Sequence, residues 1–251
     1  MRVLVPLPDR DFDTTEVAVP WQVLTAAGHS VTFATERGEG PPACDPLLLS
    51  GVLFGWLGAR ADAVASYEAL THADEYNQPL AWGSLDPAEF DGLLLPGGHA
   101  PGMRQYLGSA DLQRQVAAFW TTGRPVGAIC HGVLVLARTI DPATGRSVIA
   151  TKRTTCLPKY MERGAYALTA WRRGRYYRTY RKYVQDEVVA ALDKPEQFKR
   201  GPRTTSDRDT PLDSGPAFVV RDGNYVSARW PGDAYTFANT FAELLSRQEA
   251  R

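Results

Sequence analysis

Hydrophobic residues along the chain form short apolar runs that alternate with longer amphipathic stretches. The apolar runs have the length of buried strands and lie at residues 2–7, 31–35, 92–95 and 125–129. The stretches between them carry apolar side chains at helical spacing, at residues 14–27, 61–73 and 107–122. Strands that alternate with helices predict an α/β fold, a doubly wound parallel sheet with helices on both of its faces.

The remaining segments follow a less regular pattern. Residues 9–13 are polar and are expected to form a loop, after which Thr14 or Thr15 would cap the first helix. The later elements are expected in this order: a strand at 146–154, a helical pattern at 158–192, a hairpin at 217–228 and a closing helix at 231–247.

No linker divides the chain, so residues 1–251 are expected to form one domain. Two segments, residues 36–80 and 157–205, interrupt the regular alternation, and we interpret them as small insertions that cap this domain. In open α/β sheets, ligands bind at the C-terminal ends of the strands. The turns that follow residues 92–95 and 125–129 are therefore expected at the binding edge.

Composition narrows the classes of function. The chain has 28 Lys and Arg against 28 Asp and Glu, a formal net charge of zero, which argues against nucleic acid as a general partner. Cys44, Cys130 and Cys156 show no paired spacing, so a disulfide scaffold or a zinc site is not expected and a reducing cytoplasm fits best. The first residues predict a strand rather than a signal peptide. No apolar run approaches the ~20 residues of a membrane span.

The most informative stretch is residues 127–132, Gly-Ala-Ile-Cys-His-Gly, which we call the elbow. It joins an apolar strand to a helical pattern, the layout of a nucleophile elbow, in which a side chain is held on a sharp turn above the sheet edge. The positive end of the following helix would lower the pKa of the Cys130 thiol and favour its thiolate. The alternative is a buried, inert cysteine. The Cys130-His131 pair between two glycines favours a catalytic thiol.

A cysteine nucleophile needs a base and donors that stabilise negative charge. His131 directly follows the thiol, and its ring could reach back toward it. His99 follows the turn Pro96-Gly97-Gly98 and could line the same pocket. The backbone N–H groups of Gly98 and His131 are candidates for an oxyanion hole, so Gly97, Gly98 and His99 are candidate substrate-binding residues. An ordinary turn after a strand is the alternative for the two glycines.

Three motifs together resemble the ThiJ/PfpI superfamily. They are Leu95–His99, Gly127–Gly132 and Gly223–Ala234, and the match runs in order along nearly the whole chain. The resemblance implies a flavodoxin-like, class I glutamine amidotransferase-like fold. Within the superfamily, the heat-shock chaperone branch with its glutathione-independent glyoxalase III enzymes fits best.

The resemblance also implies roles for two carboxylates. Glu16 stands where the family carries a glutamate that hydrogen-bonds the catalytic thiol. Glu162 lies 32 residues after Cys130, close to the spacing at which related glyoxalases place an acid that orients the histidine. The implied catalytic residues are Cys130, His131, Glu162 and Glu16, with no cofactor and no metal, in a protein that is expected to be a homodimer. Without the resemblance, Glu16 is better explained as a favourable charge in the first turn of its helix, and Glu162 as part of a solvated helix face.

Residues 171–183 interleave basic and aromatic side chains. Such a pattern is typical of a nucleic-acid surface, of a self-association surface, or of an amphipathic helix whose aromatic side chains face inward. It could also cap the pocket and select an anionic or aromatic substrate. The zero net charge favours the amphipathic helix.

Three functions are compatible with these residues. The leading hypothesis is a cofactor-independent enzyme in which Cys130 adds to a small carbonyl compound, as in the glyoxalase III conversion of methylglyoxal to lactate. The second is an amidase, peptidase or hydratase in which Cys130 attacks an amide-like carbon. The third is a non-enzymatic, redox-sensing or holdase stress protein. Glutamine amidotransfer fits less well, because that chemistry uses a late His-x-Glu element and no histidine follows His131.

Overall fold

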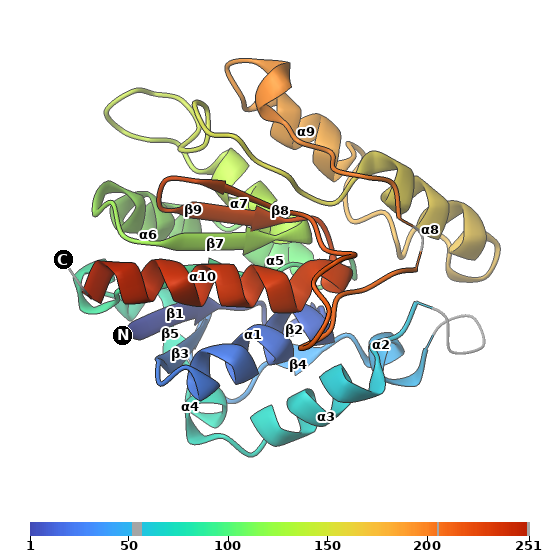
Figure 1. Ribbon diagram of the computed structural model, residues 1–251, viewed down its shortest axis with the longest axis horizontal. Helices are drawn as coiled ribbons and strands as arrows, with labels where there is room; N and C mark the ends of the chain where they lie inside the picture. Colours follow the sequence, from blue (N-terminus) through green and yellow to red (C-terminus); the bar gives the residue numbers. More distant parts are fainter. Residues whose placement is uncertain (52–56, 205, 250–251) are drawn as a thin grey trace.

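The chain is built around a seven-stranded sheet with the strand order β5-β3-β1-β6-β7-β9-β8 (Figure 1). The structure is a computed structural model and describes residues 1–51, 57–204 and 206–249. The strands of this sheet are β1 (Arg2–Pro6), β3 (Ser30–Thr35), β5 (Leu80–Ala81), β6 (Gly92–Leu95), β7 (Val126–Ile129), β8 (Val219–Asp222) and β9 (Tyr225–Ala228). All neighbouring strands are parallel except β8 and β9, which form the predicted antiparallel hairpin. The predicted doubly wound α/β fold is confirmed.

Helices cover both faces of the sheet. They are α1 (Thr14–Ala26), α2 (Pro46–Ser50), α3 (Ala61–Leu70), α4 (Asp74–Asn77), α5 (Met103–Leu107), α6 (Ala110–Thr121), α7 (Val133–Arg138), α8 (Lys159–Arg173), α9 (Val184–Ala190) and α10 (Ala234–Glu249). Helices α1, α3 and α10 pack on one side, and α5, α6 and α7 pack on the other (Figure 1). Helix α10 approaches β7 closely because Gly127 has no side chain; a Cβ there would lie 3.0 Å from the Phe237 ring.

Helix α1 is capped by Asp13, and not by Thr14 or Thr15 as the sequence suggested. Its Oδ1 accepts hydrogen bonds from the backbone N–H groups of Thr15 (2.9 Å) and Glu16 (3.1 Å). A carboxylate is an effective cap because it meets both the unpaired N–H groups and the positive end of the helix. This cap fixes the first turn of α1, where Glu16 lies.

Two segments differ in secondary structure from the prediction. Residues 9–13 are not a loop throughout, because they contain the short strand β2 (Arg10–Phe12), which pairs with β4 (Ala43–Cys44). Residues 146–154 form no strand in the part of the chain that the structure describes. Their backbone makes successive turns, in which the N–H of Ala150 donates to the carbonyl of Ser147. The apolar residues of this segment are buried but pair with no strand. A run of apolar residues does not by itself distinguish a buried strand from a buried irregular segment.

Two predicted helices are interrupted. The helical pattern at 107–122 is broken where Ser109 caps α6 by accepting the N–H of Leu112. The pattern at 158–192 contains α8 and α9, which residues 174–183 separate. Helix α8 ends at Gly174, whose φ of +56° is accessible to glycine and continues no helix.

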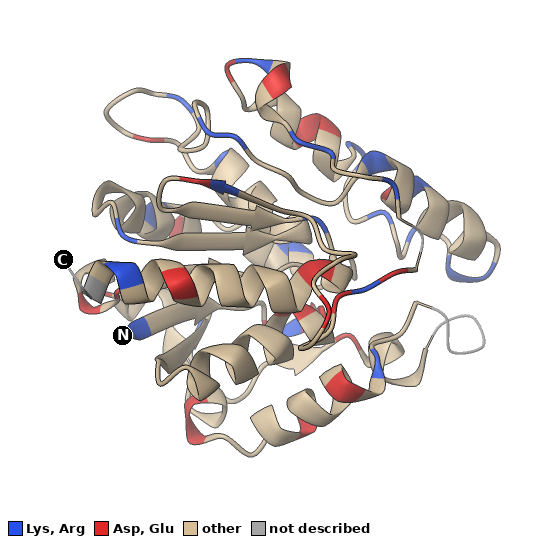
Figure 2. Cartoon of the chain, viewed as in Figure 1, with Lys and Arg blue, Asp and Glu red and all other residues tan. Residues whose placement is uncertain are grey.

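The two predicted cap segments contribute helices near the C-terminal ends of the strands. Helices α2 and α8, from residues 36–80 and 157–205, lie at this end of the sheet (Figure 1). Residues 52–56 and 205 of these segments lie outside the described part of the chain. Basic side chains gather around α8 and the loop after it, whereas α3 carries acidic ones (Figure 2).

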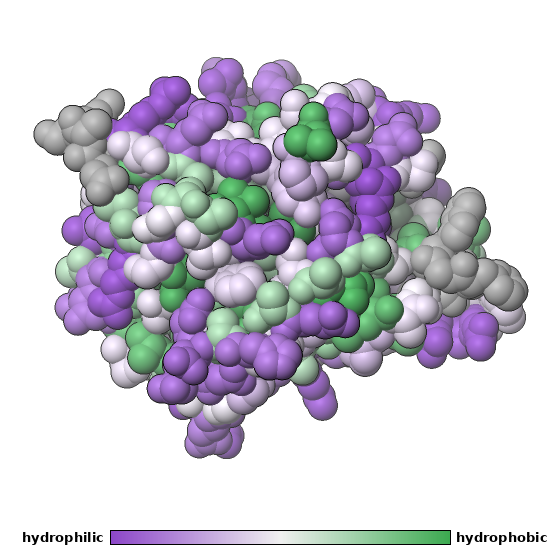
Figure 3. All heavy atoms as spheres, turned by 60° about the horizontal axis from the view of Figure 1, so that its bottom comes forward, coloured by the Kyte–Doolittle hydropathy of each residue, from purple (hydrophilic) through white to green (hydrophobic). Residues whose placement is uncertain are grey.

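The surface is mainly hydrophilic on the face shown in Figure 3, with hydrophobic residues in small patches between the polar ones. Among the helices that the structure describes, none combines the length and the apolar character needed to cross a membrane.

Strand β7 ends in a sharp turn that places Cys130 at φ +57°, a conformation that strains a side-chain-bearing residue. Gly132 makes the turn possible, because a Cβ at this position would lie 2.1 Å from the carbonyl oxygen of Leu95 and 2.6 Å from that of Pro96. The elbow therefore packs directly against the backbone at the end of β6 and just after it. This contact holds the strained residue in place.

Replacing Gly132 with Ala is expected to destabilise the fold by about 1–3 kcal/mol, because the added methyl group must displace backbone rather than a flexible side chain. Gly164 in α8 is the matched control, since a Cβ there meets nothing within 4 Å. Gly164→Ala is expected to stabilise the protein by about 0.5–1 kcal/mol through helix propensity. Urea unfolding followed by circular dichroism measures both changes. Equal stability of the two variants would contradict the close packing at Gly132.

Candidate active site

A cavity of about 400 Å³ lies at the C-terminal ends of the central strands and is lined by Cys130. Only 4% of the surface of Cys130 is exposed, so the sulfur is reached through this cavity. Both predicted cap segments contribute to its walls. Much of the lining is apolar, including Leu48, Leu157, Met161 and Leu168. The cavity has the size of a site for a small molecule.

His131 is the nearest candidate base. Its Nδ1 lies 3.5 Å from the Cys130 sulfur, within reach for exchange of a proton. Burial lowers the pKa of His131 to about 3, and the charges of His99 and Arg138 act in the same direction. The imidazole is therefore neutral near pH 7. The structure thus brings the predicted pair of thiol and imidazole together without forming an ion pair.

Glu16 reaches the elbow from the first turn of α1. Its side chain is fully buried, and its Oε2 accepts a hydrogen bond of 2.8 Å from the backbone N–H of Gly97. The other oxygen, Oε1, is buried and accepts no hydrogen bond from the nitrogen and oxygen atoms of the described residues. The carboxyl also interacts with the Cys130 thiol. Burial raises the pKa of Glu16 well above its ordinary value, and the charge of Asp13 raises it further, which favours the protonated carboxyl.

The Cys130 thiol is also protonated in the resting site. Burial raises its pKa well above the ordinary value, the charges of Glu16 and Asp13 add to this effect, and the backbone N–H of His131 opposes it. The sequence had predicted a lowered pKa from the end of the following helix. That helix, α7, has six residues, and its partial charge does not outweigh the removal of the thiol from water.

Asp13 is a site residue that the sequence analysis missed. It caps α1 and also lines the cavity beside Cys130. Burial raises its pKa to about 6, while hydrogen bonds from the backbone of Glu16 and Thr15 and the charge of Arg208 lower it. It is therefore ionised at neutral pH. A capping aspartate can be recognised from a sequence, but its place in the wall of this cavity cannot.

The predicted oxyanion-hole residues lie together at the elbow. Gly97 is packed so tightly that a Cβ would lie 2.7 Å from both Glu16 Oε2 and the backbone nitrogen of His131. The carbonyl of Gly97 accepts a hydrogen bond of 2.9 Å from the N–H of Asp13. Gly98 follows at φ +150°, and a Cβ there would lie 2.9 Å from the same nitrogen of Asp13. The turn after β6 is thus bound on one side to α1 and on the other to the elbow.

Glu162 lines the same cavity but does not hydrogen-bond the pair of thiol and imidazole. Its Oε2 accepts a hydrogen bond of 3.0 Å from the N–H of Val184, and its Oε1 lies 3.9 Å from Arg178 Nε. Among the described residues, no hydrogen bond or ion pair joins it to His131. Burial raises the pKa of Glu162 to about 7. Its predicted role as the acid that orients His131 stays a prediction.

Part of the basic aromatic segment closes the cavity. Tyr177 is buried and stacks on the ring of His99, with ring centroids 4.1 Å apart and an interplanar angle of 22°. The hydroxyl of Thr179 donates a hydrogen bond of 2.6 Å to the carbonyl of His99. Burial lowers the pKa of His99 to about 4, so this ring is neutral as well. Residues 174–183 form a connection rather than the expected helix, and they dock on the turn that follows β6.

Arg208 is the second site residue that the sequence analysis missed. It is the only Lys or Arg among the described residues that line the cavity. Its guanidinium lies over the ring of Trp230, 5.2 Å from the centroid, and donates a hydrogen bond of 3.3 Å to the carbonyl of Gly58. No motif marks this residue, because it lies in an irregular loop far along the chain from Cys130 and Asp13.

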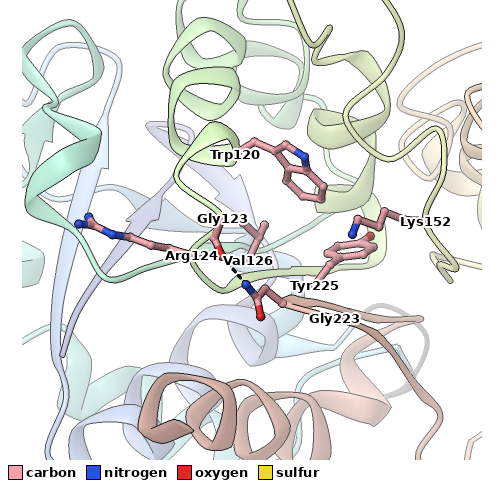
Figure 4. A pocket seen from close by; sticks show the side chains of 8 residues that line it. Trp120, Gly123, Arg124, Val126, Lys152, Gly223 and Tyr225 are labelled. Atoms are coloured by element: carbon pink, nitrogen blue, oxygen red, sulfur yellow. Dashed lines mark hydrogen bonds between the residues drawn. The ribbon is translucent and has the colours of Figure 1, made fainter. Parts of the chain in front are cut away.

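A second hollow, of about 270 Å³, lies at the opposite ends of the strands, where β7 and β9 begin (Figure 4). Asn224 donates a hydrogen bond to the carbonyl of Gly123 across it. The Arg124 guanidinium there donates to the backbone carbonyls of Ala88 and Phe90. The polar groups at this hollow thus join loops, and Cys130 lies at the other edge of the sheet.

Comparison with known proteins agrees with this architecture. Residues 7–202 match the family described as ThiJ/PfpI family-like. An uncharacterised protein of Schizosaccharomyces pombe is 31% identical over 76% of this chain and 72% of that protein. Deglycase PfpI of Pyrococcus furiosus is 25% identical over 98% of this chain and 99% of that protein. The crystal structure of glyoxalase III from Candida albicans superimposes with a TM-score of 0.67 at 21% identity, covering 97% of both chains. This chain belongs to the ThiJ/PfpI-like family.

Proposed function

We propose that this protein is a cofactor-independent cysteine enzyme that acts on small reactive carbonyl compounds, with a glyoxalase III-like conversion of methylglyoxal to lactate. The observation that carries the proposal is the position of the Cys130 sulfur, in the wall of a cavity, 3.5 Å from His131 Nδ1 and interacting with the Glu16 carboxyl. The relatives named deglycases and the structural neighbour named glyoxalase III support the same class of chemistry.

The first step is addition of the thiol to the aldehyde carbon. His131 Nδ1 takes the proton of the thiol as the sulfur attacks. The carbonyl oxygen gains negative charge, which the backbone N–H groups of Gly98 and His131 stabilise. Glu16, which holds its proton, then delivers it to this oxygen and completes the hemithioacetal.

The second step moves hydrogen between adjacent carbons. The Glu16 carboxylate left by the first step removes the proton from the hemithioacetal carbon and returns one to the neighbouring ketone carbon. His131, which holds the thiol proton, donates it to the ketone oxygen and then takes the proton of the hemithioacetal hydroxyl. The aldehyde carbon is thereby oxidised to a thioester and the ketone carbon is reduced to an alcohol, so no external oxidant is needed. Water then hydrolyses the thioester, which releases lactate and restores the thiol. Glu16 suits this shuttle because burial raises its pKa toward that of the carbon acid.

The direct test is lactate production from methylglyoxal in the absence of glutathione. The wild-type protein is expected to produce lactate, and Cys130→Ser is expected to abolish it, because the hemithioacetal cannot form. Cys156→Ala is the matched control, since this buried cysteine does not line the cavity. Unchanged activity in Cys130→Ser would refute the mechanism. An acyl-enzyme trapped at Cys130 with amide substrates, and no lactate, would identify a hydrolase instead.

The two buried glutamates are expected to differ in their effect on turnover. Glu16→Gln removes the group that moves protons, so kcat/KM for methylglyoxal is expected to fall by about 10²–10⁴-fold. Glu162→Gln keeps the acceptor for the Val184 N–H and is expected to reduce kcat/KM by less than about tenfold, because the hydrogen bonds of Glu162 lie away from the thiol. Steady-state kinetics separate the two. A loss in Glu162→Gln as large as that in Glu16→Gln would indicate that Glu162 acts together with Cys130 and His131 in catalysis.

The pH dependence of Cys130 alkylation tests the charge of Asp13. That charge raises the pKa of the thiol, so Asp13→Asn is expected to shift the curve of iodoacetamide reaction rate to lower pH. The shift applies above about pH 6, where Asp13 is ionised. Asparagine caps helices as well as aspartate does, so α1 should remain intact. The control is Asp207→Asn, at an exposed position. A curve unchanged in Asp13→Asn would show that this charge does not reach the sulfur.

A further inference from the structure

Arg208 places a permanent positive charge in the wall of the cavity that Cys130 lines. It is half-buried, and its guanidinium is bounded by the Trp230 ring and the Gly58 carbonyl, both of which also line the cavity. The stem of Arg208 lies close to Gly232, where an added Cβ would be 3.0 Å from the Arg208 Cγ. The hydrogen bond to Gly58 and the contact with the Trp230 ring place the guanidinium at the cavity.

The hydrogen-bonding capacity of this guanidinium is largely unused by the protein. A guanidinium has five N–H donors. Among the described residues, the only acceptor recorded for Arg208 is the carbonyl of Gly58. Arg229 shows the contrast: it is fully buried, pairs with both oxygens of Asp233 and donates to the carbonyls of Pro202 and Pro216. Arg229 is satisfied by the fold, and Arg208 is not.

The nearby carboxyl groups do not neutralise Arg208 directly. The charges of Asp13, Asp62 and Glu16 act on Arg208 in its favour and that of Arg60 acts against it, but no ion pair within 4 Å joins any described carboxylate to Arg208. Oδ1 of Asp13 is occupied by two backbone N–H groups at the start of α1. Burial raises the pKa of Glu16, which favours its uncharged form. A guanidinium that is removed from water is stabilised when a carboxylate or phosphate accepts hydrogen bonds from its unused N–H groups, often two parallel ones.

We propose that Arg208 binds an anionic group of the substrate, so that the preferred substrates are reactive carbonyl compounds that also carry a carboxylate. This inference rests on the proposed function and assigns to it a substrate class. The wall of the cavity that Arg208 and Cys130 share includes apolar side chains such as Leu157 and Met161. A short methylene chain between the carbonyl and the carboxylate fits such a wall. Arg208 thus acts as a specificity residue that orients the reactive carbon toward the sulfur.

Two alkylating reagents test the anion site without any assumption about turnover. Iodoacetate and iodoacetamide present the same carbon to a thiol, which displaces iodide and forms one carbon–sulfur bond in both cases. They differ in that only iodoacetate is anionic. The ratio of their rates at Cys130, measured by peptide mass spectrometry, reports how far the cavity favours the anion. Cys44 and Cys156 are buried and do not line the cavity, so they serve as internal references.

Arg208→Gln is expected to lower the ratio of the iodoacetate rate to the iodoacetamide rate by about 10- to 100-fold, the effect of losing one hydrogen bond to a charged group. Arg208→Lys should retain part of the preference, because it keeps the charge but not the planar pair of donors. The matched control is Arg203→Gln, an exposed position on the same loop that does not line the cavity. It should leave the ratio unchanged. An unchanged ratio in Arg208→Gln, or an equal change in Arg203→Gln, would overturn the proposal.

A matched pair of substrates tests the same residue in turnover. 4,5-Dioxopentanoate and 2-oxopentanal share the aldehyde, the adjacent ketone and the chain length, and only the first carries a carboxylate. The expected product of the first is 2-hydroxypentanedioate, formed by addition of water with oxidation of one carbon and reduction of the next. Arg208→Gln is expected to reduce kcat/KM for 4,5-dioxopentanoate by about 10- to 100-fold and to leave that for 2-oxopentanal nearly unchanged.

The two experiments fail in distinguishable ways. If the wild-type protein turns over neither dicarbonyl but its alkylation ratio depends on Arg208, the proposed function is refuted and the anion site is supported. If both dicarbonyls are turned over and Arg208→Gln slows both reactions equally, the proposed function is supported and the proposed substrate class is refuted. A purely structural role of Arg208 would slow both reactions in this way.

Discussion

The close packing of two backbone turns, with the first turn of α1 beside them, is the constraint on which the site depends. Gly132 lets the elbow rest on the carbonyls of Leu95 and Pro96, and Gly97 leaves room for the Glu16 carboxyl and the His131 backbone. Two hydrogen bonds join α1 to the turn after β6: Asp13 N–H to Gly97 carbonyl, and Gly97 N–H to Glu16 Oε2. The strain at Cys130 is maintained because these contacts leave its backbone no room to relax.

The same packing determines the electrostatics. A thiol, an imidazole and a carboxyl group are removed from water together, and burial favours the neutral form of each. The pKa of Cys130 and that of Glu16 rise, and the pKa of His131 falls. In the resting site, the Cys130 sulfur is therefore a neutral thiol. In the mechanism that we propose, reaction therefore begins with proton transfers on contact with a substrate, and not with a preformed thiolate. A protonated thiol is also less readily oxidised than a free thiolate.

The irregular segments of the chain form much of the cavity wall. Residues 174–183 leave the regular helical pattern and dock on the turn after β6, where Tyr177 stacks on His99. The loop that carries Arg208 adds a positive charge to the wall. In the function that we propose, the core of the sheet supplies the nucleophile and its proton carriers, while the irregular segments supply the selectivity. This division is common in α/β proteins, whose scaffold strands hold the chemistry and whose loops vary.

The main strands of the sheet, the hairpin and the elbow could be predicted from local patterns, because strand periodicity and the Gly-Ala-Ile-Cys-His-Gly turn are local properties of the chain. The strand expected at 146–154 was wrong, and the interruption of the helical pattern at 158–192 was missed, since apolar patterning alone does not specify backbone pairing. The folded chain was needed to show that Asp13 and Arg208 share a cavity with Cys130, that Glu162 accepts a hydrogen bond from Val184, and that the thiol keeps its proton. Distances between segments far apart in the chain, and the water that folding removes, set these properties.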